Sequence, residues 1–277
     1  MLQKVEVPVM DVEGKRVLIT GGSSGIGLEL ARGLAARGAR LVIAACGAAR
    51  VDEAVGALNA SGAEAAGITA DVATPIGRTA ALQGAIEAFG GLDILVNNAG
   101  AVRAGRLDAI DEEEIRAMIE VDLVAPIMLT RTALPLLRAG SESMIVNVSS
   151  AIALVAMPFY ATYAAVKAGL SSFGESLRRE LNGEGVRVMT VYPSGTDTPM
   201  MATNQAGPEI GFSLEPAEAV AEAIIAGIKH DAINVVRGGP ERQALIDLNS
   251  KDPMAIDAHF LAIKDVFERD VRSHCAL

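Results

Sequence analysis

The sequence predicts a doubly wound α/β fold, in which a parallel sheet of about seven strands is covered by helices on both faces. Three observations lead to this prediction. Short apolar runs alternate with longer amphipathic segments, and these runs contain almost no polar residues, which is typical of strands buried on both faces. No linker and no internal repeat divides the 277 residues. Right-handed connections then bring the loops that follow the strands to one edge of the sheet.

The expected elements follow from the alternation of the two patterns along the chain. The strands, in order, span residues 16–20, 40–45, 65–70, 93–97, 144–149, 186–192 and 232–236. The helices between them span residues 25–37, 50–60, 74–89, 112–137, 161–181 and 216–229. We therefore expect a single domain over residues 1–277 whose core is residues 14–236.

Two segments lie outside this core. Residues 200–214 are irregular and contain Gly207-Pro208 and Gly211, which predicts a lid over the site. Residues 240–277 form a C-terminal tail with one apolar helical stripe, made of Ile256, Phe260, Ile263, Phe267 and Val271. Such a stripe predicts a helix that packs on the body of the protein or on a neighbouring subunit.

Composition restricts the partners of the chain. A net charge of −10 disfavours nucleic acid and anionic membranes, so a small-molecule substrate is expected. The first sixteen residues lack an apolar signal core, and no apolar run reaches the length of about 20 residues that spans a bilayer. Two cysteines make no disulfide framework, which predicts a cytoplasmic protein. The three histidines form no cluster with cysteine, so no metal site is expected.

The stretch LITGGSSGIG, residues 18–27, fits two different motifs. It contains the G-x-S-x-G pattern of a nucleophile elbow, with Ser23 as the nucleophile of a serine hydrolase. The same residues form a glycine-rich turn between a strand and a helix, which suits a dinucleotide. The turn follows the first strand, whereas an elbow serine normally follows a strand well into the sheet. Its glycines also continue to Gly27, beyond the elbow motif, where close helix–strand packing and a bound pyrophosphate require glycine. The phosphate-binding interpretation is therefore preferred, and the hydrolase remains the alternative.

A second motif places a phenol and an ammonium on one helix face, because Tyr163 and Lys167 are four residues apart. Two unit charges about 4 Å apart interact by roughly 4 kcal/mol at a dielectric near 20, or about three pKa units. We therefore expect the pKa of Tyr163 to fall from about 10 toward 7, where the phenol exchanges protons. Ser150 comes just after the fifth strand, at the functional edge, where it could hold a substrate oxygen. Tyr160 and Tyr192 have no lysine at this spacing.

Together these motifs resemble the short-chain dehydrogenase/reductase family over residues 14–236, with thirteen residues from Ser150 to Tyr163. The resemblance implies a Rossmann fold and the catalytic residues Ser150, Tyr163 and Lys167. Tyr163 and Lys167 also bind the cofactor. The other cofactor-binding residues that it implies are Gly21, Ser23, Ser24, Gly25, Ile26, Gly27, Asp71, Val72, Asn98, Ala99, Gly100, Pro193, Thr196 and Thr198.

The resemblance also implies a mechanism and an assembly. A hydride passes between nicotinamide C4 and a carbonyl or carbinol carbon, and Tyr163 passes the proton. Lys167 lowers the pKa of Tyr163 and binds the nicotinamide ribose, and Ser150 positions the substrate oxygen. The family pairs two helices across a two-fold axis, and Ala164, Ala168 and Ser172 form a small-residue stripe on one of them. We therefore expect a homodimer or homotetramer.

The chain departs from the family pattern at four positions. Asp122 stands where the family usually has a catalytic asparagine, and Ser194 replaces a glycine. Ala45 takes the place of the carboxylate that binds a ribose 2′-hydroxyl in NAD enzymes, and Cys46 the place where NADP enzymes often carry arginine. Without that carboxylate, NADP(H) is favoured over NAD(H), with Arg50 as a phosphate partner.

The apolar segments 151–159 and 200–212 predict a hydrophobic ketone or alcohol as substrate. TGGSSGIG together with TDTP also resembles the 3-ketosphinganine-reductase branch of the family. Two alternatives use the same fold: a cofactor-binding sensor or scaffold without turnover, and an isomerase or dehydratase.

Overall fold

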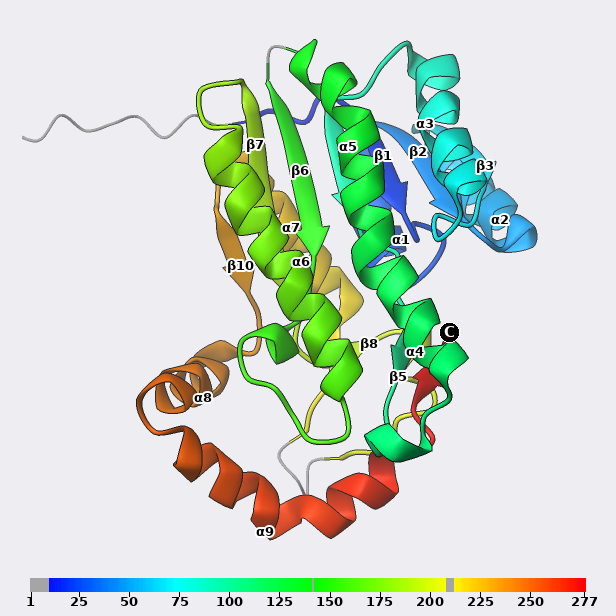
Figure 1. Ribbon diagram of the computed structural model, residues 1–277. Coiled ribbons are helices and arrows are strands. Elements are labelled where there is room, and N and C mark those ends of the chain that lie inside the picture. Colours follow the sequence, from blue (N-terminus) through cyan, green and yellow to red (C-terminus); the bar gives the residue numbers. More distant parts are fainter. Residues whose placement is uncertain (1–9, 141, 208–211) are drawn as a thin grey trace, which may run out of the picture.

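The computed structural model describes residues 10–140, 142–207 and 212–277, and a seven-stranded parallel sheet forms its centre (Figure 1). The strand order is β10-β7-β6-β4-β1-β2-β3, so the chain winds outward from β1 in both directions. Every neighbouring pair is parallel. The strands are β1 (Arg16–Thr20), β2 (Arg40–Ala45), β3 (Glu64–Thr69), β4 (Ile94–Asn97), β6 (Ser143–Val148), β7 (Val186–Tyr192) and β10 (Asn234–Val236). The predicted doubly wound fold is confirmed, and its reversal of direction between β1 and β4 opens the crevice where such folds bind ligands.

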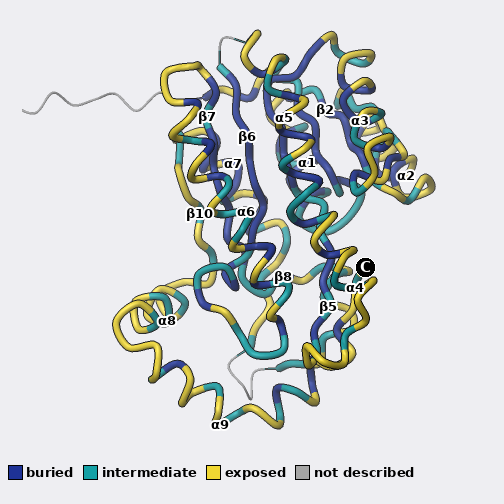
Figure 2. The backbone as a smooth tube through the Cα atoms, in the orientation of Figure 1, coloured by how far each residue is buried: buried dark blue, intermediate teal, exposed yellow. Residues whose placement is uncertain are grey.

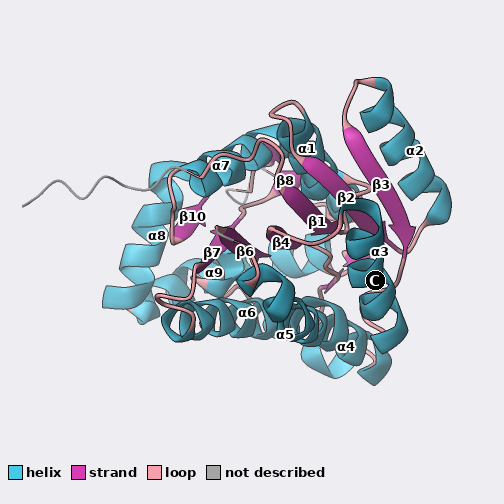
Figure 3. Cartoon of the chain, turned by 90° about the horizontal axis from the view of Figure 1, so that it is seen from above, coloured by secondary structure: helices cyan, strands magenta, loops and turns pink. Residues whose placement is uncertain are grey.

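Helices cover both faces of the sheet (Figure 3). One face carries α1 (Gly25–Ala35), α2 (Ala48–Ala60) and α7 (Ala217–Lys229). The other carries α3 (Pro75–Phe89), α5 (Ala125–Arg138) and α6 (Ala161–Glu180).

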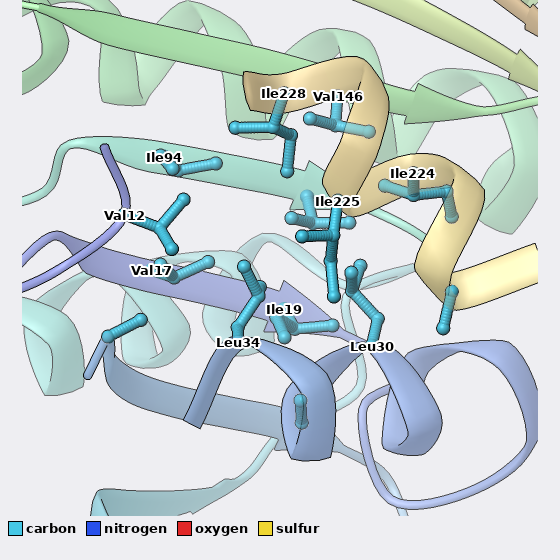
Figure 4. Packing of buried hydrophobic residues seen from close by; sticks show 14 of the residues in the cluster. Val12, Val17, Ile19, Leu30, Leu34, Ile94, Val146, Ile224, Ile225 and Ile228 are labelled. Carbon is cyan, nitrogen blue, oxygen red and sulfur yellow. The ribbon is translucent and has the colours of Figure 1, made fainter. Parts of the chain in front are cut away.

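Each face of the sheet has its own hydrophobic core. Ile19 packs with Leu30 of α1 and Ile225 of α7 on one face (Figure 4). Leu18, the residue before Ile19 in β1, packs in the cluster on the other face. This alternation explains why the central strands are apolar at successive interior positions, and Figure 2 shows burial concentrated in these strands.

The single helix expected over residues 112–137 is interrupted. The structure has α4 (Glu112–Ile119), a π-helical segment at Glu120–Val124, and then α5. Pro126 has no N–H and cannot donate to the Asp122 carbonyl, which favours a widened turn at this point. The π-helical segment places the Asp122 side chain in the interior, where it is fully buried.

The C-terminal tail crosses the carboxyl-terminal edge of the sheet from the β10 side to the β5 side (Figure 1). It consists of α8 (Gly239–Lys251), α9 (Pro253–Val271) and β11 (Cys275–Ala276). Phe267 and Val271 of the predicted stripe are buried on the body of the same chain. The sequence did not predict that β11 pairs antiparallel with β5 (Val102–Arg103).

The remaining elements are short. The predicted lid contains a 3₁₀ turn at Pro199–Met201, and its residues 208–211 lie outside the described residues. A two-stranded parallel pair joins β8 (Thr196–Asp197) to β9 (Glu215–Pro216). Further 3₁₀ turns span Leu107–Ala109 and Ala151–Ala153. Over the described part of the chain, no helix is both long and apolar enough to cross a membrane, and no group of side chains is arranged to hold a metal ion.

Candidate active site

The glycine-rich turn after β1 brings the start of α1 close to the sheet. Gly21 has a positive φ of 66°, and a Cβ atom there would lie 2.9 Å from the Ala99 Cα. A Cβ atom on Gly27 would lie 2.5 Å from the Gly21 carbonyl oxygen and from Asn98 Nδ2. Only glycine fits these two positions without moving backbone. Ser24, the N-cap residue, makes no side-chain cap to the first turn of α1, whose N–H groups remain available to a phosphate.

Asn98 fixes this turn against β4. Its side-chain amide donates to the Thr20 carbonyl at 3.0 Å and to the Gly21 carbonyl at 3.2 Å. The Thr20 hydroxyl accepts from the backbone N–H groups of Asn98 and Ala99, at 3.0 and 3.1 Å. The ends of β1 and β4 are therefore held rigidly at the point where the winding of the sheet reverses. A dinucleotide fits this geometry, because the glycines leave room for it and the N–H groups face it.

A cavity of about 250 Å³ opens above these strand ends. Thirteen of the predicted site residues line it: Gly21, Ser24, Gly25, Ile26, Asn98, Ala99, Gly100, Ser150, Tyr163, Lys167, Pro193, Thr196 and Thr198. The other four predicted residues, Ser23, Gly27, Asp71 and Val72, are not among its lining residues. Gly27 lies behind the turn, where it packs on Gly21, and Asp71 and Val72 follow β3 at the far edge of the sheet.

Tyr163 and Lys167 are brought to the cavity by α6. The Lys167 Nζ atom lies 5.7 Å from the centre of the Tyr163 ring and 2.9 Å from Asp122 Oδ1. It also donates to the Val148 carbonyl at 3.2 Å. Both members of this ion pair are buried, with 5% of the lysine side chain exposed and none of the aspartate side chain.

Asp122 is held by its backbone surroundings as well. Its Oδ2 atom accepts from the Ala101 N–H at 3.2 Å. A Cβ atom on Gly100 would lie 2.7 Å from Asp122 Oδ1, so the glycine makes space for the carboxylate. The π-helical segment, Gly100 and Lys167 therefore act together to bury one negative and one positive charge in contact.

The pKa values of Lys167 and Tyr163 depend on burial as well as on the charges around them. Burial alone would lower the pKa of Lys167, but the Asp122 carboxylate outweighs it and holds the pKa above its ordinary value. Burial raises the pKa of Tyr163 above its ordinary value, although Lys167 acts to lower it. The predicted fall of the Tyr163 pKa toward 7 is therefore wrong for this structure. That prediction included the charge of Lys167 alone. Desolvation of the phenol and the negative charge of Asp122 both act in the opposite direction and raise the pKa.

Ser150 stands at the end of β6 beside Tyr163. Its hydroxyl accepts from the Ile152 N–H at 3.3 Å. Ser150 also acts to lower the pKa of Tyr163, against the effect of burial. The Ala151 N–H donates to the Pro193 carbonyl at 2.8 Å, which ties this loop to the loop after β7. The structure thus gathers Ser150, Tyr163 and Lys167 at one end of the cavity and the glycine-rich turn at the other.

A model of the family described as short chain dehydrogenase matches residues 15–209. The chain belongs to the short-chain dehydrogenase family. It is an NAD(P)-dependent oxidoreductase.

Relatives with known names and structures agree with this assignment. The 3-oxoacyl-acyl-carrier-protein reductase FabG of Vibrio cholerae is 36% identical over 69% of this chain and 77% of its own length. A short chain dehydrogenase from Burkholderia cenocepacia, solved in complex with NADP, has a TM-score of 0.76 at 34% identity, covering 83% of this chain and 98% of its own. A family member from Burkholderia phymatum, solved in complex with NAD, has a TM-score of 0.81 at 25% identity, covering 89% and 96%.

In this short-chain dehydrogenase a second polar cluster faces the same cavity. The Tyr160 hydroxyl lies 2.8 Å from His274 Nδ1, and the Asn204 side-chain amide donates to that hydroxyl at 3.1 Å. His274 Nε2 lies 3.0 Å from the Met200 carbonyl, so it carries the proton and leaves Nδ1 to accept from Tyr160. Burial lowers the pKa of His274 and raises that of Tyr160.

The sequence pattern does not predict this cluster. No lysine follows Tyr160 at helical spacing, and His274 lies far along the chain, in the tail. Their meeting depends on the β5–β11 pairing, two residues long, which has no recognisable pattern in the sequence. The aromatic residue Phe267, buried against both Tyr160 and Phe159, was the one available signal that the tail returns to the site.

The geometry does not favour the hydrolase alternative. Ser23 does not line the cavity and makes no hydrogen bond to a histidine among the described residues. His274, the one histidine lining the cavity within the described chain, is engaged with Tyr160, Asn204 and Met200.

Proposed function

We propose that the protein interconverts a ketone and a secondary alcohol, with Tyr163 exchanging the proton of the substrate oxygen. The observation that carries this proposal is the buried Lys167–Asp122 ion pair beside Tyr163, which lines the cavity together with Ser150. Such an arrangement favours a positive charge on Lys167, beside one phenol, in a cavity that a ligand can enter.

The roles of the side chains follow from their charges. In the reduction, Tyr163 gives its proton to the carbonyl oxygen, and Ser150 donates a hydrogen bond that positions that oxygen. The phenolate left behind is buried and therefore unfavourable, and the Lys167 ammonium stabilises it. Asp122 is a positioning residue, because it keeps Lys167 charged without contacting the substrate.

A nicotinamide cofactor supplies the hydride when it is bound. The residues that would hold it are the glycine-rich turn for the phosphates, Asn98, Ala99 and Gly100 along β4, and Pro193, Thr196 and Thr198 after β7. Ser23, Asp71 and Val72 would complete the adenine end, and Lys167 would bind the ribose.

We favour NADP(H) over NAD(H). The last residue of β2 is Ala45 and the next is Cys46, so the strand itself supplies no carboxylate here, although Asp71 lies near Cys46. The Arg50 guanidinium turns back toward this strand end, since a Cβ atom on Gly47 would lie 3.1 Å from Arg50 Nε. A cation at this position suits a ribose 2′-phosphate.

The substrate end of the cavity supports an apolar ketone. Its walls beyond Ser150 and Tyr163 include Ile152, Met157, Met200, Met201 and Phe212. The narrower assignment to the 3-ketosphinganine-reductase branch stays a prediction.

We also propose that two copies pair through α5 and α6, which lie side by side on one face (Figure 3). Ala168 and Ser172 of the small-residue stripe are exposed there, while Ala164 is buried, and Met128 of α5 is 40% exposed. Light scattering at micromolar protein tests this: we expect a dimer or tetramer, and a monomer would contradict it.

The experiment that tests the function measures the oxidation of NADPH and NADH against a panel of apolar ketones. We expect turnover of at least one ketone with a higher kcat/KM for NADPH. A chain that binds the cofactor but oxidises neither form with any ketone or alcohol of the panel would contradict the proposal and favour a sensor.

A further inference from the structure

Arg242 is a cation in the cavity for which the described residues offer no acidic partner. It lies in the first turn of α8 and lines the cavity together with Ser194. Its Nη2 atom donates to the Ser194 hydroxyl at 3.3 Å, and none of its nitrogen atoms lies within ion-pair distance of a described carboxylate. Arg237, a few residues earlier, differs in this respect because it pairs with Glu215 at 2.7 Å.

Structural roles do not account for this arginine. Burial lowers the pKa of Arg242, and no described charge opposes that effect. Its position near the N-terminus of α8 is also one where the helix dipole disfavours a cation. A guanidinium that is partly desolvated, lies at the unfavourable end of a helix and makes one neutral hydrogen bond has unused donors for a ligand.

The charges of the residues that line the cavity also favour an anionic ligand. The chain carries a net charge of −10, yet none of the described residues that line the cavity is an aspartate or a glutamate. Lys167, the other cation of the lining, is already neutralised by Asp122. Among the described residues of the lining, Arg242 is therefore the cation that has no carboxylate partner.

The position of Arg242 separates this charge from the dinucleotide. It follows β10, at one edge of the sheet, whereas the glycine-rich turn follows β1. Strands β7, β6 and β4 lie between them, and the catalytic Ser150 follows β6. Asn249 of α8 donates to the Leu154 carbonyl at 3.4 Å, so α8 borders the loop after Ser150. An anion at Arg242 would therefore lie beyond the reacting carbonyl, on the side away from the cofactor phosphates.

We propose that the substrate carries a carboxylate at the far end of an apolar segment and that Arg242 binds it. The inference rests on the proposed ketone chemistry and narrows it to oxo acids and hydroxy acids whose charge is separated from the reacting carbon. The apolar walls receive the intervening segment, and Arg242 receives the carboxylate through charge-assisted hydrogen bonds.

The test compares oxo acids of increasing chain length with their methyl esters, which keep the ketone and remove the charge. With the cofactor-loaded full-length protein, we expect one chain length at which the acid exceeds its ester in kcat/KM by roughly tenfold to a hundredfold, the range of a hydrogen bond to a charged group. Arg242→Met should collapse this ratio toward one, chiefly through KM, and Arg242→Lys should restore part of it. Lys251→Met removes an exposed positive charge from the same helix and should leave the ratio as in the wild type.

The outcomes separate this inference from the proposed function. Equal kcat/KM for acids and esters at every length, or a ratio unchanged by Arg242→Met, would overturn the anion site while the ketone chemistry stands. Absence of turnover with every compound would overturn the proposed function. The anion site would then be tested by calorimetry with the saturated acids on the cofactor-bound protein. Binding at least tenfold weaker in Arg242→Met supports the site, and equal binding overturns it.

Discussion

Two tyrosines three residues apart at the start of α6 face the same cavity in surroundings of different charge. Tyr163 lies beside Lys167, which is paired with Asp122, and lines the cavity together with Ser150. Tyr160 lies against neutral groups, His274, Asn204 and the ring of Phe267. Burial raises the pKa of both phenols, but a nearby cation opposes this effect at Tyr163, whereas none of the described residues supplies such a cation at Tyr160.

The comparison shows that a nearby positive charge distinguishes a tyrosine that can donate its proton from one that only lines the cavity. A buried phenol can give up its proton only where a positive charge stabilises the phenolate. Around Tyr163 the chain maintains such a charge through a second buried charge, Asp122. Around Tyr160 the hydrogen bonds satisfy the hydroxyl and join the C-terminal tail to the lid segment.

The largest difference is expected when each hydroxyl is removed. Tyr163→Phe should lower kcat by about a thousandfold, since it removes the proton donor but leaves the ring. Tyr160→Phe should lower kcat by no more than about fivefold and cost about 1–2 kcal/mol of unfolding free energy, because it leaves His274 Nδ1 with Asn204 alone. Equal losses of kcat in steady-state assays would remove the distinction between the two regions.

The next effect concerns the charge that supports Tyr163. Asp122→Leu should lower kcat by about a hundredfold and reduce unfolding free energy by about 3–5 kcal/mol, because Lys167 is left buried without its partner. Asp122→Asn should keep kcat within roughly tenfold, about 1.4 kcal/mol of barrier, since the amide can still accept from Lys167. The control is Glu120→Gln, an exposed residue of the same π-helical segment. A loss of a hundredfold or more in Asp122→Asn, with circular dichroism unchanged, would mean that the charge itself is essential.

A smaller effect is expected at the cofactor end of the site, on the preference between NADPH and NADH. Ala45→Asp places a carboxylate at the end of β2, where it repels a 2′-phosphate and can accept from a 2′-hydroxyl. We expect the ratio of kcat/KM for NADPH to that for NADH to fall by about tenfold, or roughly 1.4 kcal/mol. Ala45→Asn has nearly the same shape without the charge and should shift the ratio less. A wild-type protein that prefers NADH by tenfold or more would falsify the NADP(H) assignment.

The smallest effect is on stability and concerns the neutral region. Because burial lowers the pKa of His274, the unfolded chain binds a proton at a higher pH than the folded chain does. The stability contributed by the neutral ring is complete above the unfolded pKa of about 6.5 and is lost as the pH falls below it. Urea unfolding at about pH 7.5 and about pH 5.5 should show a smaller pH-dependent loss in His274→Gln than in the wild type. His259→Gln, at an exposed position, should resemble the wild type.

The two regions also differ in how far the sequence predicts them. Tyr163, Lys167 and Ser150 follow from short-range spacing and from positions at strand ends, which a regular alternation of strands and helices fixes. Asp122 was visible as a departure, but its contact with Lys167 depends on the π-helical turn and on the space left by Gly100. His274 and Arg242 line the cavity, and Tyr160 meets His274, because the tail returns across the sheet edge (Figure 1). That path is set by packing between distant segments, for which local patterns carry no information.

The measurement that tests the central claim most directly follows deuterium into the product alcohol from NADPH that carries deuterium at both C4 positions. With a turned-over ketone, we expect one deuterium on the carbinol carbon for each cofactor oxidised, and labelled product formed about a thousandfold more slowly with Tyr163→Phe. Cofactor oxidation that leaves the alcohol unlabelled, or labelling that continues undiminished in Tyr163→Phe, would contradict the assignment of this cavity and this tyrosine to carbonyl reduction.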